Sequence, residues 1–323
     1  MNKSLRIIAV MLAVPVALIA TGSTATAPAV SQVELLAAVS PHRHIYAADM
    51  QGDYGVAVGA LGTVLETRDG GQSWSDKSLH EPLAMLAVAI SGERAVAIGQ
   101  LGLIAVQDGG NWVTVRAPTE ERLLGVALNT RGQGIAVGAF GTVLRSEDGG
   151  LGWQRVDIDW ETFFPSGDEP HVYDVHIDEH NRITLAGEFG MVLRSDDAGQ
   201  SWRLLRRGDA SLFALKVDGS NAFAVGQDGT VLRSQDEGAS WQELDTGVSA
   251  NLLGATRGPM RRQLLVPGMR SVLYSGDSGD SWRELIDGDF SRGWYGDAIW
   301  SERLGGFLLF GHGGRIRIIK GIN

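Results

Sequence analysis

A short apolar run that ends in a turn and then a tryptophan recurs six times along this chain. The first copy runs from Val56 to Trp74, and a close copy runs from Ile135 to Trp153. The tryptophans that end the copies are separated by 38, 41, 49, 39 and 41 residues. They are Trp74, Trp112, Trp153, Trp202, Trp241 and Trp282. A period of about forty residues is typical of a β-propeller in which each repeat forms one blade.

Each repeat divides into four short strands joined by Gly, Asn and Asp, the residues that hairpin turns require. In the third repeat the strands are expected at Leu123–Leu128, Gly134–Gly138, Thr142–Ser146 and Trp153–Asp157. The 44 glycines among 323 residues are about twice the usual share of roughly 7%, which suits many tight turns. We therefore expect an all-β chain.

The end of the chain predicts a seventh blade that is completed by the beginning. After Trp282 the sequence holds only three further strands, at Trp294–Trp300, Gly306–Phe310 and Arg315–Ile319. The missing outer strand is supplied by Val33–Val39. Joining the two ends in one blade closes the ring and leaves no open inner edge. The predicted fold is a seven-bladed β-propeller of four-stranded blades, closed by an N-terminal strand.

The first residues predict a secretory signal. Lys3 and Arg6 precede an apolar run from Ile7 to Ala20, and small residues follow up to Ala29. We expect a signal peptide over residues 1–29 and a single domain over residues 30–323, exported to the periplasm or beyond. A retained membrane anchor is the alternative, although it needs about 20 apolar residues.

Composition excludes several classes of function. The chain has no cysteine, which removes disulfides, thiol catalysis and lipid attachment through a cysteine. A net charge of −10 without a basic run argues against nucleic acid as a partner. The histidines lack metal-ligand spacing such as His-x-x-x-His. We expect a monomer without cofactor, metal or, after cleavage of the signal, a membrane span.

The turn before each tryptophan fits the pattern Ser/Thr-x-Asp-x-Gly-x-x-Trp. Five copies fit: Thr67–Trp74, Ser146–Trp153, Ser195–Trp202, Ser234–Trp241 and Ser275–Trp282. The copy at Val106–Trp112 is one residue short and lacks the hydroxyl. The pattern resembles the Asp box, or BNR repeat, of sialidases and other propellers. One carboxylate per turn is too few for calcium, so we expect each Asp to accept hydrogen bonds within its own turn.

The longer unit, Ala-Val-Gly-x-x-Gly-Thr-Val-Leu followed by the turn, resembles the photosystem II stability/assembly-factor family. It stands at Ala57–Trp74, Ala136–Trp153 and Ala224–Trp241, with a looser copy at Ala186–Trp202. The resemblance implies a propeller without catalytic activity that helps to assemble a membrane complex. The chain lacks the cysteine that anchors some members to lipid and the paired arginines of some signals. We therefore expect a non-photosynthetic bacterial member, a periplasmic scaffold for a membrane assembly or exporter.

Candidate partner-binding residues lie where the repeats disagree. Small side chains in one register of the innermost strands are expected to face the axis: Ala47, Ala87, Gly125, Asp174, Ala214, Gly254 and Gly296. Three residues earlier, a second register is expected to line the channel mouth: His44, Ala84, Arg122, His171, Ser211, Asn251 and Gly293, with Arg43 and Arg292 adjacent. Ordinary solvated rim residues are the alternative interpretation.

The hairpins between the second and third strands are expected on the same face, and they contribute Glu188, Asp228 and His312 as candidates. The Asp boxes are then expected on the opposite face. A recurring Leu-Arg-Ser adds Arg145, Arg194 and Arg233 in one register, since an arginine-rich surface is associated with partner binding in the family. The alternative is that their stems cover neighbouring tryptophans.

The longest repeat holds an insertion with Trp160, Phe163 and Phe164 beside acidic residues. Exposed aromatic side chains are typical of contact surfaces, and a loop that packs its own aromatics is the alternative.

An enzyme is the competing hypothesis. Glycoside hydrolysis requires two carboxylates about 5 to 10 Å apart, and Glu188 and Asp228 are the candidate pair. The Phe/Tyr-Arg-Ile-Pro segment of sialidases is missing. We therefore expect a non-catalytic binding module, with a carbohydrate-acting propeller as the alternative.

Overall fold

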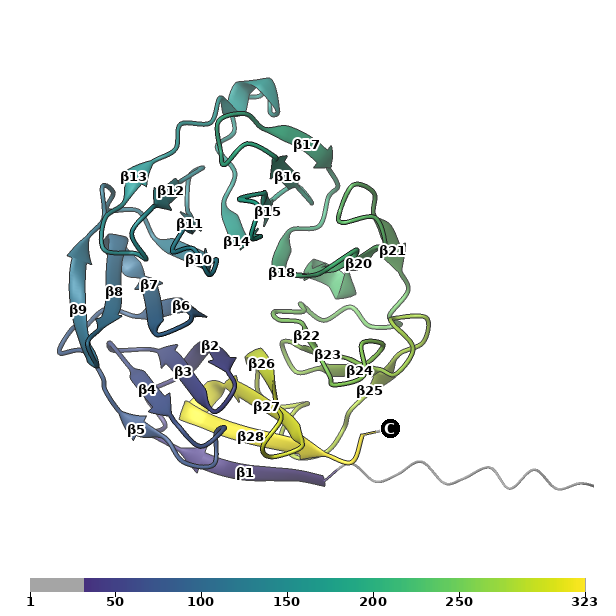
Figure 1. Cartoon of the computed structure of the whole chain (residues 1–323). Helices are drawn as coiled ribbons and strands as arrows, with labels where there is room; N and C mark the ends of the chain where they lie inside the picture. Colours follow the sequence, from purple (N-terminus) through teal and green to yellow (C-terminus); the bar gives the residue numbers. More distant parts are fainter. Residues whose placement is uncertain (1–31, 323) are drawn as a thin grey trace, which may run out of the picture.

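The computed structural model describes residues 32–322, which form seven four-stranded antiparallel sheets arranged as a ring (Figure 1). The predicted signal at residues 1–29 lies outside the described residues, so the domain boundary stays a prediction. The helical segments within residues 32–322 are four short 3-10 turns: η1 (Gln100–Gly102), η2 (Trp160–Thr162), η3 (Gln227–Gly229) and η4 (His312–Gly314). No helix in this part of the chain is both long and apolar enough to cross a bilayer.

Each blade is a consecutive meander from the axis outward. Blade 1 contains β2 (Ile45–Gln51), β3 (Tyr54–Gly59), β4 (Val64–Thr67) and β5 (Ser75–Asp76). Blade 2 contains β6 (Met85–Ser91), β7 (Arg94–Gly99), β8 (Leu103–Asp108) and β9 (Asn111–Arg116). Blade 3 contains β10 (Leu123–Leu128), β11 (Gly134–Gly138), β12 (Val143–Ser146) and β13 (Gln154–Arg155). Blade 4 contains β14 (Val172–Ile177), β15 (Ile183–Gly187), β16 (Val192–Ser195) and β17 (Arg203–Arg206). Blade 5 contains β18 (Leu212–Asp218), β19 (Asn221–Gly226), β20 (Val231–Ser234) and β21 (Gln242–Leu244). Blade 6 contains β22 (Thr256–Arg257), β23 (Leu264–Pro267), β24 (Val272–Ser275) and β25 (Arg283–Glu284).

Blade 7 joins the two ends of the chain, which confirms the predicted closure. It contains β26 (Tyr295–Ser301), β27 (Gly306–Gly311), β28 (Arg315–Lys320) and, on the outside, β1 (Gln32–Ala38). Strand β1 lies along β28 in Figure 1, with Val33 opposite Ile319 and a bulge between Leu35 and Ala37. The ring is therefore closed by backbone hydrogen bonds between residues almost 300 positions apart in the sequence.

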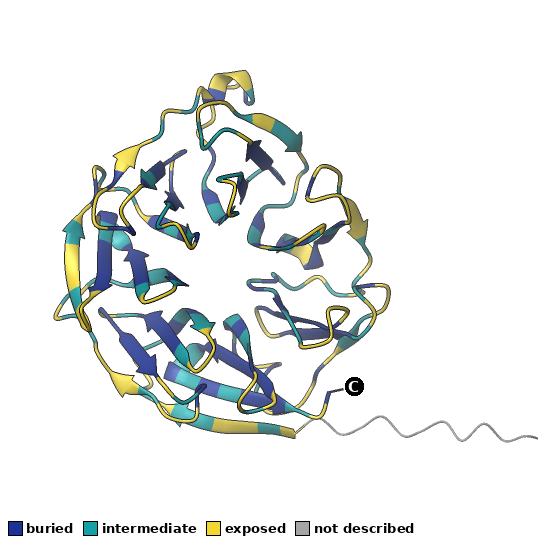
Figure 2. Cartoon of the chain, viewed as in Figure 1, coloured by how far each residue is buried: buried dark blue, intermediate teal, exposed yellow. Residues whose placement is uncertain are grey.

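The core lies between neighbouring blades. The two middle strands of each blade are almost wholly buried, whereas the outer strands are exposed (Figure 2). In one cluster, Ile98 and Val106 of blade 2 pack with Leu144 and Trp153 of blade 3. Burial of such side chains stabilises each blade only through its neighbour, as expected for a repeat fold.

The glycine that ends the Ala-Val-Gly motif is required because two strands approach closely there. Gly59 ends β3, and a Cβ atom there would lie 1.9 Å from the carbonyl oxygen of His44. The equivalent glycines meet an equivalent carbonyl at 1.9–2.4 Å: Gly99, Gly138, Gly187, Gly226, Gly268 and Gly311. Seven-fold recurrence of this contact explains why the motif persists while the neighbouring residues vary.

The Asp boxes are closed hydrogen-bonded turns, as predicted. Asp69 Oδ1 accepts bonds from the Thr67 hydroxyl (2.8 Å) and from the Ser73 N–H (2.9 Å). The Trp74 indole donates to the Gly71 carbonyl. Hydrogen bonds from Ser73, then from Thr67, lower the pKa of Asp69 to about 2. No group of three or more His, Asp or Glu side chains within residues 32–322 is arranged to hold a metal ion.

Candidate functional site

The two faces of the ring differ in which turns they carry. The hairpins between the second and third strands lie beside the start of the innermost strand, since the Ala60 N–H donates to the His44 carbonyl (2.9 Å). The Asp boxes lie at the other strand ends, where the Gly70 N–H donates to the Asp53 carbonyl (3.0 Å). We call these the hairpin face and the Asp-box face. This placement agrees with the expectation from the sequence.

The register of the seventh blade differs from the sequence prediction by one residue. The His312 N–H donates to the Trp294 carbonyl, the contact that His44 makes in blade 1, so Trp294 rather than Gly293 belongs to the mouth register. A bulge between Tyr295 and Asp297 then places Asp297, not Gly296, opposite Phe310. The prediction failed because a glycine was aligned with small residues, whereas the register is decided by strand pairing.

Three mouth residues connect neighbouring blades. The Nδ1 atom of His44 accepts the N–H of Gly313 (2.9 Å), and Nδ1 of His171 accepts the N–H of Phe140 (3.0 Å). The Asn251 side chain accepts the N–H of Asp228 (3.3 Å) in the same arrangement. Each bond caps a hairpin tip of the preceding blade, so these polar residues serve the scaffold as well as the mouth.

Other predicted mouth residues remain unpaired. The side chains of Arg122 and Arg292 are exposed and form no ion pair or hydrogen bond with other residues of 32–322. Arg270, at the hairpin tip of blade 6, is equally exposed and unpaired. The hairpin face therefore carries three free guanidinium groups in a chain of net charge −10.

No hydrogen bond joins Glu188 to Asp228, the two carboxylates predicted as a catalytic pair. Glu188 Oε2 accepts the N–H of His171 (2.8 Å), which caps the start of β14. Gln100 and Gln227 make the same contact in blades 2 and 5, each at the N–H that begins the innermost strand. The carboxylate of Glu188 thus occupies a position where an amide oxygen serves equally well.

His312 belongs to a charged cluster inside blade 7. Its Nε2 atom lies 3.2 Å from Asp289, and its ring packs 5.5 Å from that of Tyr295. Asp289 also pairs with Arg315 and Arg317. Burial alone would raise the pKa of Asp289, but hydrogen bonds from Tyr295 and Arg317 hold it below its ordinary value. Burial lowers the pKa of His312.

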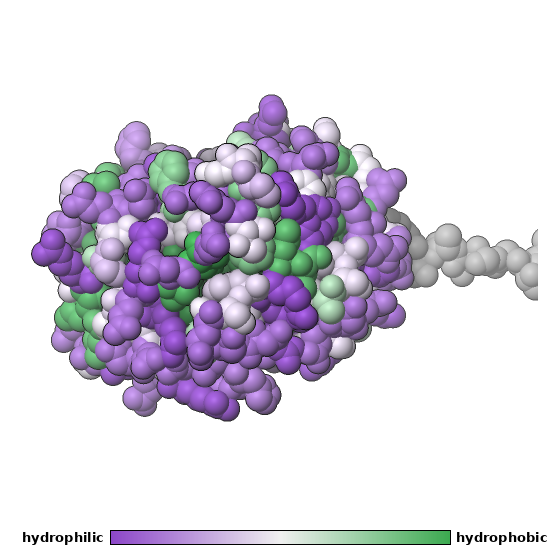
Figure 3. Space-filling model, turned by 90° about the horizontal axis from the view of Figure 1, so that it is seen from above, coloured by the Kyte–Doolittle hydropathy of each residue, from purple (hydrophilic) through white to green (hydrophobic). Residues whose placement is uncertain are grey.

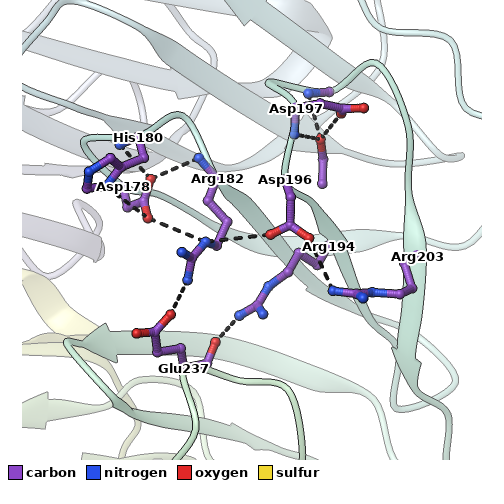
Figure 4. Close-up of polar contacts among 10 residues, drawn as sticks. Asp178, His180, Arg182, Arg194, Asp196, Asp197, Arg203 and Glu237 are labelled. Atoms are coloured by element: carbon purple, nitrogen blue, oxygen red, sulfur yellow. Dashed lines mark hydrogen bonds and ion pairs between the residues drawn. The ribbon is translucent and has the colours of Figure 1, made fainter.

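The arginines of the Leu-Arg-Ser register lie on the Asp-box face and bind the next blade. Arg145, Arg194 and Arg233 each donate to a backbone carbonyl of the following Asp box, those of Ala198, Glu237 and Ser278. Figure 4 shows Arg194 reaching Glu237, while Arg182 lies between Asp178, Asp196 and Glu237. These guanidinium groups therefore connect blades, and Arg194 is buried.

The aromatic side chains of the insertion fold beneath it, so of the two interpretations left open by the sequence the loop that packs its own aromatics is confirmed and the exposed patch is wrong. Trp160 and Phe164 are buried in the core of blades 3 and 4, and Phe163 packs against them. The Trp160 indole donates to the Gly141 carbonyl (3.2 Å), and Arg207 lies 4.7 Å above the Phe164 ring. Figure 3 shows the ring edge-on from the side of blade 4, where most of the surface is hydrophilic and hydrophobic residues reach it in several small, separate patches.

Three aspartates on the innermost strands connect blades across the channel wall, and the sequence prediction missed this role. Each accepts the N–H of its own following residue and that of a residue in the next blade. The bonds across blades are Asp49 to Ile90 (2.7 Å), Asp174 to Leu215 (2.7 Å) and Asp297 to Ala48 (3.0 Å). For Asp174, its place in a column of Gly and Ala was the available signal.

The channel wall alters the ionisation of these groups. Burial raises the pKa of Asp174 to about 6 and that of Asp297 to about 7, against the opposing effect of the backbone N–H bonds. Burial likewise lowers the pKa of His176 to about 4. Lys216, the nearby cation, partly offsets the increase for both aspartates.

Apolar side chains surround the channel mouth just inside the polar register. One half-buried residue from the innermost segment of each of blades 1 to 6 contributes: Tyr46, Leu86, Leu124, Tyr173, Phe213 and Leu253. Tyr46 stacks on Trp294 with ring centroids 5.7 Å apart, and Tyr173 meets Phe213 edge-on at 5.1 Å. The mouth is therefore apolar within and basic at its rim, a combination suited to binding polypeptide.

The fold and its turns define the class of protein: a seven-bladed Asp-box propeller closed by its N-terminal strand. Residues 104–206 match the model of the family described as photosynthesis system II assembly factor YCF48. The photosystem II assembly lipoprotein Ycf48 of Synechococcus sp. (strain CC9902) is 30% identical over 110 residues, 31% of this chain. The chain spans 33% of the length of that curated relative.

Two solved structures extend the similarity of fold to nearly the whole chain. YCF48 from Cyanidioschyzon merolae has a TM-score of 0.71 at 19% identity and covers 90% of this chain and 99% of its own. YCF48 bound to D1 peptide has a TM-score of 0.70 at 17% identity, with coverage of 92% and 100%. The resemblance predicted from the repeats is confirmed: this chain is a propeller similar to the photosystem II assembly factors.

Proposed function

We propose that this chain is a non-catalytic, exported scaffold that binds a membrane-protein subunit during assembly or maintenance of a membrane complex. The similarity to the assembly factors supports this role, and one protein of the same fold is described as bound to D1 peptide. The predicted signal at residues 1–29 supports a periplasmic location. We expect the scaffold to act as a monomer on a partner that need not belong to a photosystem.

The observation that carries the proposal is the contrast between the two faces. On the Asp-box face the arginines of the Leu-Arg-Ser register are occupied by the next blade. On the hairpin face Arg122, Arg270 and Arg292 are exposed and unpaired. Unpaired arginines around an apolar mouth favour a partner that supplies both carboxylates and apolar side chains.

The surroundings of Glu188 support a non-catalytic role. Its carboxylate accepts a backbone N–H where two other blades use glutamine. A general acid or nucleophile must instead face the reacting atoms.

A pull-down from detergent-solubilised membranes tests the proposal. The mature chain should retain a defined integral membrane protein, and Arg122→Glu with Arg292→Glu should reduce its recovery about ten-fold if two ion pairs at the interface are lost. Arg131→Glu, on the Asp-box face of blade 3, is the matched control and should recover the membrane protein as well as the wild type does. A direct titration of the mature chain with D1 peptide tests whether it binds the same peptide as its structural relative.

Absence of any retained membrane protein would refute the assembly role. Turnover of a glycan that disappears in Glu188→Gln would establish the carbohydrate-acting alternative instead.

A further inference from the structure

The hairpin tips place bulky apolar residues in a backbone conformation that disfavours them. One residue at each tip is left-handed, with φ between 50° and 64°. In blades 1 to 7 these residues are Leu61, Leu101, Phe140, Phe189, Asp228, Arg270 and Gly313. Glycine, asparagine and aspartate adopt this conformation readily, whereas leucine and phenylalanine rarely do. Backbone geometry therefore does not explain why leucine or phenylalanine stands at the tips of blades 1 to 4.

Three of these four side chains do not pack into the core. Phe189 joins the core beneath the insertion. Leu61, Leu101 and Phe140 are 51%, 65% and 56% exposed, and none belongs to a core cluster within residues 32–322. The ring of Phe140 meets that of His171 in a T-shaped arrangement, at 4.9 Å between ring centroids. Strained and exposed apolar residues on three consecutive blades indicate a site whose other half is missing.

Arg122 lies between two of these tips. Its carbonyl accepts the N–H of Ala139, the neighbour of Phe140 (2.9 Å). The carbonyl of the preceding residue, Glu121, accepts the N–H of Gly102, the neighbour of Leu101 (2.9 Å). The Arg122 guanidinium is therefore an unpaired cation between two exposed apolar side chains.

A shallow groove continues from Leu101 toward the outside of blade 2. It has a volume of about 500 Å³, and its lining includes the apolar Leu83, Leu103, Val115 and Pro118 together with the charged Arg116 and Glu120. The surface around Leu101 can thus receive several consecutive side chains rather than a single one.

We propose that Leu61, Leu101, Phe140 and Arg122, which we call the apolar crown, are the docking surface for an apolar peptide segment that carries an acidic side chain. This inference rests on the proposed function and identifies the part of the hairpin face that binds the partner. The unpaired Arg122 supplies the charge that complements the partner's carboxylate. Three unpaired arginines on the hairpin face of a chain of net charge −10 attract an anionic bilayer less than the clusters of about four to eight cations that bind such membranes, which favours a polypeptide as the occupant.

The test uses a fluorescent model peptide, Leu-Phe-Glu-Leu-Leu with a Gly-Ser tail, and measures its binding to the mature chain by anisotropy. The triple variant Leu61→Asn, Leu101→Asn, Phe140→Asn should weaken binding at least about ten-fold, because the apolar contacts are removed. Its melting temperature should not fall, because asparagine suits the left-handed conformation. Leu151→Asn and Arg131→Glu, on the Asp-box face, are matched controls and should bind like the wild type.

A charge exchange tests the role of Arg122. Arg122→Glu should weaken binding of the Glu peptide, and a peptide with Lys in place of Glu should restore it. Equal binding by the wild type and the triple variant would overturn the inference, as would crown-dependent binding to phosphatidylcholine/phosphatidylglycerol vesicles without peptide binding. A membrane protein retained equally by the wild type and by the triple variant would overturn the crown and leave the proposed function standing. Loss of peptide binding in the triple variant, with no membrane protein retained by the wild type, would support the crown and refute the assembly role.

Discussion

Substitution of a single repeat glycine should disrupt the fold because a Cβ atom has no room at the end of the second strand. In Gly226→Ala the added carbon would lie 1.9 Å from the Ser211 carbonyl oxygen and 3.0 Å from Leu212 Cα. Both neighbours are backbone atoms, so the strands must separate by about 1.5 Å to reach ordinary van der Waals contact.

The magnitude follows from the contacts that this separation breaks. The Gln227 N–H to Ser211 carbonyl bond (3.0 Å) would be lost, and β18 would shift at Leu212, which is fully buried. A lost backbone bond costs about 1 kcal/mol, and overpacking with backbone shifts costs about 1–3 kcal/mol or more. We expect Gly226→Ala to reduce the free energy of unfolding by about 2–4 kcal/mol.

Urea denaturation followed by tryptophan fluorescence measures the effect. The control is Gly219→Ala in the same blade, where a Cβ atom meets nothing within 4 Å and only the positive φ of 59° opposes the substitution. That conformational penalty is about 1 kcal/mol. If Gly226→Ala unfolds within about 1 kcal/mol of the wild type, or no more easily than Gly219→Ala, the steric explanation of the repeat is wrong.

Four further predictions concern the closure, the turns and the channel. Deleting β1 (Gln32–Ala38) should abolish cooperative unfolding, because it uncovers β28 and opens the ring; a truncated chain that melts like the mature protein would contradict this. Glu188→Gln should melt at the wild-type temperature, because glutamine makes the same contact in two other blades. Neither the wild type nor this variant should turn over a glycan. Asp69→Ala should lower the melting temperature, and added calcium should leave that of the wild type unchanged, since the carboxylate is used within its own turn and offers too few ligands for calcium. The raised pKa of Asp297, about 7, means that the folded protein holds this proton more tightly than the unfolded chain. Its contribution to stability is therefore fully present below about pH 4 and is lost as the pH rises through 7. Thermal melts from pH 5 to 8 should show a decline that is shallower in Asp297→Asn, and parallel profiles would contradict the assignment.

The candidate site was only partly predictable. The mouth register was correct in six blades because the repeats align there, but its seventh member is Trp294 rather than Gly293, because strand pairing and not residue size decides the register. Sequence proximity of aromatic and acidic residues suggested an exposed insertion, yet Trp160 and Phe164 are buried because the neighbouring blades leave an apolar space beneath the loop.

The sequence by itself determined the architecture. The forty-residue period, the glycines at strand ends and the self-contained Asp boxes all depend on contacts within one repeat or between adjacent strands, and such local constraints recur visibly in the sequence. The closing strand was also predictable, because three strands of the last repeat lacked a fourth.

Tertiary structure decided which polar and apolar groups remain free. Arg122 and Arg194 are both arginines in repeat registers, yet the first is unpaired at the hairpin face and the second is buried against the next blade. Leu101 and Phe189 share one left-handed position, yet only Leu101 is exposed. These differences arise from the neighbouring blade, whose contacts a single repeat does not contain.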